Sequence, residues 1–88
     1  MAFDLERPWR LADQVALRSE PFGALAYHFG TRRLSFLKTT KLLAVVQALG
    51  EHPTGRSACA AAGVSDAELG AYERALGTLV DSGMVVAA

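Results

Sequence analysis

The side chains able to do chemistry in this chain are few and scattered. His28, His52 and Cys59 are the best candidates for ligating a metal or attacking a substrate, but no ligand spacing joins them. Cys59 lies among alanines, where a thiol commonly serves as a small packing group, and no motif places an activating base beside it. The sequence therefore predicts no metal, no cofactor and no catalysis, and we expect a binding protein, not an enzyme.

The charge is zero overall but unevenly distributed. The first 44 residues hold seven lysines and arginines against four acidic residues, and the last 44 hold two against five. The last predicted helix carries Asp66, Glu68, Glu73 and Asp81 against Arg74 alone. A recognition helix of a DNA-binding protein needs positive charge to meet phosphates. A winged helix-turn-helix DNA-binding function is therefore the weaker alternative, and nucleic acid is not the expected partner.

The first half of the chain has the alternating pattern of strands. Three runs alternate with a period of two and are separated by short turns containing glycine, which is typical of an antiparallel meander. In the second run Leu25, Tyr27 and Phe29 share one face, and in the third Leu34 and Phe36 share one face. The predicted strands cover residues 15–20, 24–29 and 33–37.

The second half has the pattern of helices. Thr39 or Thr40 can cap a first helix, which Gly50 can end, and a short second helix is expected near residues 57–62. Ser65 and Glu68 form a capping box for a third helix that runs to about residue 82, before an extended tail. The predicted fold is one α+β domain over residues 1–88: a three-stranded antiparallel sheet followed by three helices, resembling a winged helix-turn-helix.

The two outer strands of such a sheet leave backbone groups unpaired. An extended peptide can add itself to an exposed strand edge, and side-chain pockets then give selectivity. The third strand, 33–37, leads directly into the helices, so a groove can lie beside it. The cations around it, Arg32, Arg33 and Lys38, can equally serve only to block unwanted pairing of the edge. The pattern by itself does not decide between peptide binding and a merely blocked edge. It also leaves open whether this edge pairs with a second copy of the chain.

The composition of the chain indicates the cellular compartment in which we expect the protein. The chain has 88 residues, 51% of them apolar, and a single cysteine, so disulfides do not stabilise it. No apolar run reaches the about 18 residues of a membrane span, and the N-terminus lacks the organisation of a secretory signal. We expect a cytoplasmic protein that does not associate with membranes.

One stretch is specific enough to suggest a family. Residues 15–39, VALRSEPFGALAYHFGTRRLSFLKT, closely resemble the mycofactocin biosynthesis chaperone family, and the segments PWRLADQVALR and DSGMVV fit it too. The resemblance covers about residues 8–86. That family is similar to pyrroloquinoline quinone biosynthesis protein D and other precursor-peptide recognition elements, whose order of three strands and three helices is the one predicted here.

The resemblance implies a partner and a site. The partner is the leader of a ribosomally made precursor peptide, which the domain presents to a radical S-adenosylmethionine maturase that carries the clusters and the chemistry. The leader is expected to pair with the third strand and lie over the third helix. The residues implied in backbone pairing are Arg33, Leu34, Ser35, Phe36 and Leu37, and those implied as pocket walls are Tyr72, Ala75, Leu76 and Leu79.

Some of these assignments carry alternatives. Leu76 is central in its helical stripe and is favoured as core, whereas Tyr72 has the apolar body and polar tip of a pocket residue. Arg32, Arg33, Lys38 and Lys41 can meet acidic leader residues or can be ordinary solvated charges. If the Leu37 N–H faces the peptide, Leu37→Pro is expected to weaken binding.

Overall fold

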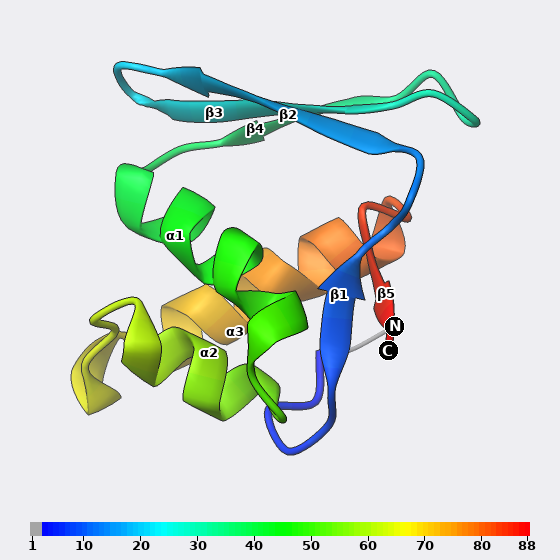
Figure 1. Cartoon of the computed structure of the whole chain (residues 1–88). Helices are drawn as coiled ribbons and strands as arrows, with labels where there is room; N and C mark the ends of the chain where they lie inside the picture. Colours follow the sequence, from blue (N-terminus) through cyan, green and yellow to red (C-terminus); the bar gives the residue numbers. More distant parts are fainter. Residues whose placement is uncertain (1–2) are drawn as a thin grey trace.

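The computed structural model describes residues 3–88 as a three-stranded sheet lying over a layer of helices, with a second, two-stranded sheet beside them (Figure 1). The elements are β1 (Trp9–Leu11), β2 (Val15–Glu20), β3 (Gly23–His28), β4 (Leu34–Leu37), α1 (Thr40–Ala48), the 3₁₀ helix η1 (Leu49–Glu51), α2 (Gly55–Ala61), α3 (Asp66–Asp81) and β5 (Val85–Ala87). The α+β class and the three main helices are as the sequence predicts. Among the described residues, no helix is long and apolar enough to cross a membrane.

The larger sheet is the predicted antiparallel meander, in the order β2-β3-β4. The turn between β3 and β4 is organised by His28, whose Nδ1 accepts hydrogen bonds from the Gly30 and Thr31 N–H groups, both at 3.1 Å. Arg32 completes this turn with a φ of 61°, a left-handed conformation uncommon for a residue other than glycine. Arg33, expected within the third strand, lies in the turn just before β4.

The helices begin where the capping signals predict. The Thr39 hydroxyl accepts a hydrogen bond from the Leu42 N–H at 3.0 Å, which starts α1. Ser65 and Glu68 form both halves of the capping box at α3. An additional capping box between Thr54 and Ser57 starts α2 two residues earlier than predicted. Gly50 does not directly end α1, because a 3₁₀ turn continues the chain there.

The prediction of a single sheet was incomplete. β1 and β5 form a second antiparallel pair, in which Trp9 lies opposite Ala87 and Leu11 opposite Val85. The expected extended tail is therefore a strand, bonded to a partner some 75 residues earlier in the chain. Neither three-residue segment has a local signal strong enough to announce such a pairing. With this extra sheet beside the helices, the likeness to a winged helix-turn-helix is only partial.

The core lies between the three-stranded sheet, α1 and α3, and continues down to β1 and α2. Its largest fully buried side chains include Leu37, Leu49, Leu76 and Met84. At the lower end, the Trp9 ring stacks on Phe3 with 4.8 Å between centroids, and the Trp9 indole N–H donates to the Asp4 carbonyl. Trp9, with 5% of its surface exposed, is therefore a core residue.

Candidate functional site

A groove runs between the free edge of β4 and α3. It has a volume of about 550 Å³, within the range of about 300–1,000 Å³ that is usual for ligand pockets. Leu42 and Leu79, both nearly buried, give it an apolar floor. The lining residues are Leu34, Ser35, Phe36, Lys38, Thr39, Leu42, Ala71, Tyr72, Ala75, Thr78 and Leu79.

The groove exists because α3 presents small side chains toward β4. Ala71, Ala75 and Thr78 follow one another at helical spacings of four and three residues, so they lie on one face of α3. None of them is long enough to fill the space up to the strand. The aromatic ring of Tyr72 stands beside this stripe, half-buried, as the one aromatic side chain that α3 contributes to the lining.

The phase of the ladder between β3 and β4 decides which backbone groups of β4 are free. The His28 N–H donates to the Arg33 carbonyl at 2.9 Å, so these two residues form a hydrogen-bonded pair. Hydrogen-bonded pairs recur every second residue in an antiparallel ladder. The next pairs are therefore Ala26 with Ser35 and Ala24 with Leu37, in the register observed.

The other side of β3 gives the same phase. The Phe29 N–H donates to the Gln14 carbonyl at 2.8 Å, so the odd-numbered residues of β3 bond to β2 and the even-numbered ones to β4. The backbone N–H and C=O groups of Leu34 and Phe36 consequently point away from β3. Within residues 3–88 no strand pairs with that side of β4.

Leu37 does not contribute a donor to this edge. Its backbone faces β3, and its side chain is buried, with 1% of its surface exposed. The condition attached to Leu37→Pro, that the Leu37 N–H faces the peptide, is therefore not met, and that substitution would damage the sheet itself. Leu34 and Phe36 are the positions of β4 at which proline would remove a free donor.

The structure brings most of the predicted site residues together. Seven of them line the groove: Leu34, Ser35, Phe36, Lys38, Tyr72, Ala75 and Leu79. Leu76 does not, because it is fully buried in the core, as its central position in the stripe favours. Arg32, Arg33, Leu37 and Lys41 are also outside the lining.

Four lining residues escaped the sequence analysis: Thr39, Leu42, Ala71 and Thr78. Thr39 caps α1 and Leu42 is nearly buried within it, and both also border the groove. The small residues of α3 did carry a signal, since a stripe of Ala71, Ala75 and Thr78 next to a large apolar stripe marks a face that packs loosely or binds something.

The charges beside the groove differ in how free they are. Lys41 is bonded to Glu68, with Nζ at 3.1 and 3.2 Å from the two carboxylate oxygens. The pKa of Glu68 is lowered, first by the Ser65 N–H and then by Lys41, because both favour the ionised form. Lys38 is exposed at the groove, and no ion pair involves it among the described residues. Lys38 is thus the cation best placed to meet an acidic ligand group.

The candidates for chemistry lie apart from the groove. Cys59 is a fully buried residue of α2, and burial raises the pKa of its thiol, which disfavours the nucleophilic thiolate. His28 is occupied by the turn that it organises. Over residues 3–88, no three side chains of the metal-binding types come together.

A free strand edge beside an apolar groove on a small α+β domain is the class of site to which an extended peptide can add itself. The comparisons with known proteins agree with this class. Residues 8–86 match the Peptide chaperone MftB family, and the chain belongs to that family.

Two relatives, both called Peptide chaperone MftB, are closely similar over nearly the whole chain. The protein of Mycobacterium ulcerans is 61% identical over 97% of this chain and 78% of its own length. That of Mycobacterium tuberculosis is 58% identical over 96% of this chain and 77% of its own length. No solved structure is significantly similar.

Proposed function

We propose that this chain is a peptide chaperone of mycofactocin biosynthesis that binds the leader of the precursor peptide as an added strand on β4. The observation that carries the proposal is the pair of residues Leu34 and Phe36, whose backbone groups face away from β3 toward an apolar groove. The names of its relatives supply the class of ligand, a peptide.

The dimensions of the site suit a short extended segment. β4 has four residues, which at about 3.3 Å per residue span about 13 Å, enough to pair with about four residues of peptide. Alternate side chains of an added strand point to opposite faces of the sheet. Those on the inner face would enter the groove over Ala75 and Leu79, and those on the outer face would remain accessible.

This division of labour gives the peptide two kinds of recognition. The backbone groups of β4 pair with any extended sequence, whereas Tyr72 and the small stripe of α3 select side chains by size. Lys38 adds a preference for an acidic residue near one end of the segment. The chaperone then presents the peptide to a radical S-adenosylmethionine maturase, which raises the effective concentration of the peptide at that enzyme.

The experiment is titration of the chain with its synthetic leader by calorimetry, combined with amide NMR shifts. We expect one peptide per chain with micromolar or tighter affinity, which corresponds to about −8 kcal/mol or better. The largest shifts should lie at Leu34, Phe36 and Tyr72. Absence of both heat and shifts with the cognate leader would refute the proposal. Shifts confined to α2 would show that the peptide binds at α2 and not at the groove.

The charge of α3 argues against DNA as the ligand. The helix that a helix-turn-helix would place in the major groove carries an excess of acidic residues, so phosphates would repel it. A gel shift at low salt tests this alternative directly. We expect no shifted protein–DNA complex. DNA binding whose affinity falls steeply with salt would instead support the DNA-binding function.

A further inference from the structure

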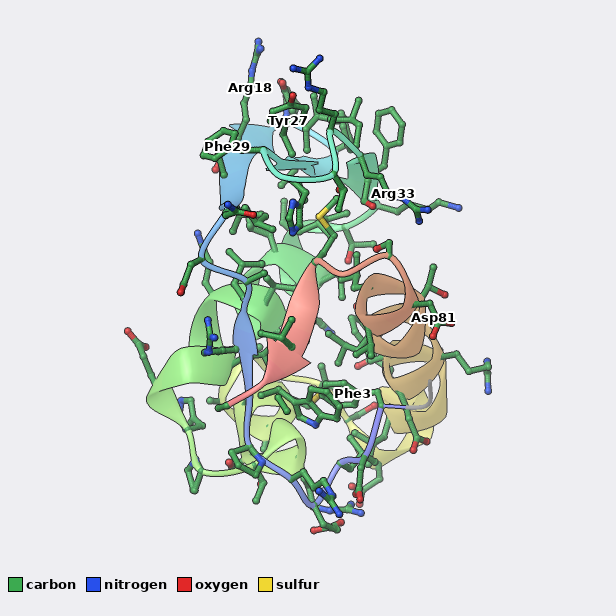
Figure 2. The ribbon with its side chains drawn as sticks, turned by 90° about the vertical axis from the view of Figure 1, so that its right-hand side faces the viewer. Phe3, Arg18, Tyr27, Phe29, Arg33 and Asp81 are labelled. Carbon is green, nitrogen blue, oxygen red and sulfur yellow. The ribbon has the colours of Figure 1, made fainter. Side chains whose placement is uncertain are left out.

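The outer face of the three-stranded sheet is unusually apolar. Leu25 and Tyr27 of β3 lie opposite Phe36 and Leu34 of β4, so all four point to one side of the sheet. Tyr27, Leu34 and Phe36 expose 38%, 53% and 59% of their surface. Figure 2 shows Tyr27 and Phe29 on the side of the sheet that faces away from the helices.

On the inner face of the same sheet, β3 itself carries small side chains, and the large fully buried residue is Leu37 of β4. The residues of β3 that point toward the helices and are fully buried are Ala24 and Ala26. An antiparallel sheet with one solvated face normally turns its large apolar side chains inward and its polar ones outward. Here the larger side chains of β3 contribute little to the core, so packing within this domain does not explain them.

Two aromatic pairs tie this face together. Phe22, in the turn between β2 and β3, lies 6.4 Å from Phe36 between ring centroids, and Tyr27 meets Phe29 edge-on at 5.6 Å. Monomeric proteins rarely expose contiguous apolar patches beyond a few hundred Å², and larger ones usually mark interaction sites. We name the set Phe22, Leu25, Tyr27, Phe29, Leu34 and Phe36 the aromatic face.

The charges around the aromatic face are mostly positive. Arg18 shares the face with Leu25, its cross-strand neighbour, and Arg32, Arg33 and Lys38 border it, all of them exposed. The one carboxylate between residues 15 and 38, Glu20, is bonded to Arg18 at 2.9 Å. A second copy of this chain would bring like charges together. The complementary surface is an apolar one bordered by carboxylates.

We propose that the aromatic face docks a second, folded protein, whose contact surface is apolar with an acidic border, while the groove holds the peptide. The identity of that protein rests on the proposed function: it is the maturase that receives the peptide. β4 links the two surfaces, because Leu34 and Phe36 give their backbone to the groove and their side chains to the aromatic face.

This shared strand predicts coupling between the two ligands. A peptide added to β4 would extend the sheet, and its outward side chains would continue the aromatic face. The docking protein would then contact the chaperone and the peptide at once, so each ligand strengthens the binding of the other.

The test uses a double variant, Tyr27→Ser with Phe29→Ser, because both residues are exposed and neither lines the groove. The matched control is Glu51→Ser with Ala60→Ser, two exposed positions on the helical side. Calorimetry measures binding of the synthetic leader, and biolayer interferometry measures binding of the purified maturase, with and without saturating leader.

We expect the double variant to bind leader within about twofold of wild type but the maturase at least tenfold more weakly, since buried aromatic anchors dominate interfaces. The control should match wild type in both assays, and leader should raise the affinity of wild type for the maturase about fivefold or more. Unchanged maturase binding by a folded double variant would overturn the inference. Loss of leader binding by wild type would instead refute the proposed function.

Sedimentation of the wild-type chain tests whether a second copy of the chain occupies the aromatic face instead. We expect a monomer at the concentrations of the assays. A dimer that the Tyr27→Ser, Phe29→Ser variant abolishes would assign the aromatic face to self-association and overturn the inference.

Discussion

Replacing Phe36 with proline tests the strand edge most directly. The Phe36 N–H points away from β3, so its removal leaves the ladder between β3 and β4 intact. Proline is tolerated on an edge strand when its missing N–H would have faced outward. A bound peptide, however, would lose one of the donors that this edge offers, and the carbonyl it pairs with would be left without a protein partner.

The size of the effect follows from that lost pairing. One backbone hydrogen bond contributes about 0.5–1.5 kcal/mol net, and leaving a buried acceptor unsatisfied costs about 1–3 kcal/mol. The groove is open on one side, so water can reach the carbonyl in part, and we take about 1.4 kcal/mol, or a tenfold loss of affinity.

The matched control is Phe36→Ala, which removes the same aromatic ring but keeps the N–H. The ratio of the two dissociation constants for the leader, measured by calorimetry, isolates the backbone donor from the side chain. Circular dichroism and amide NMR spectra establish that both variants are folded. Equal affinity of two folded variants would refute the assignment of Phe36 as a pairing residue.

The remaining predictions concern the groove, the core and the cap of α3. Ala75→Trp should fill the groove and weaken leader binding at least tenfold in calorimetry, whereas Arg74→Leu, on an exposed face of the same helix, should leave it unchanged; equal effects would contradict the site. Leu76→Ala should lower the free energy of unfolding by about 2–5 kcal/mol, measured with urea, because it leaves a cavity in the core. Glu68→Gln should lower the melting temperature at neutral pH, because the lowered pKa of Glu68 means that its ionised form stabilises the folded state above pH 4.5. That contribution is lost as the pH falls through the folded-state pKa, so the two melting curves should converge in acid; a constant difference would contradict the assignment.

Local signals were sufficient to predict the elements that position the site. The alternation of residues 15–20, the glycine-containing turns and the capping pair Ser65 and Glu68 act over a few residues, so each can be read without knowing the rest of the chain. They placed β4 and α3, and the family resemblance then pointed to the edge of one and the face of the other. The helical stripe likewise favoured Leu76 as core.

Contacts between segments that are distant in the sequence could be found only from the tertiary structure. β1 pairs with β5 across most of the chain, and Lys41 meets Glu68 from 27 residues away, through contacts that no local pattern encodes. A period of two also says which side chains share a face of a sheet but not which face is buried. Packing against α1 and α3 buries the face of β3 that carries the alanines, so the aromatic face lies outside. The backbone groups of Leu34 and Phe36 remain free at the edge of the sheet.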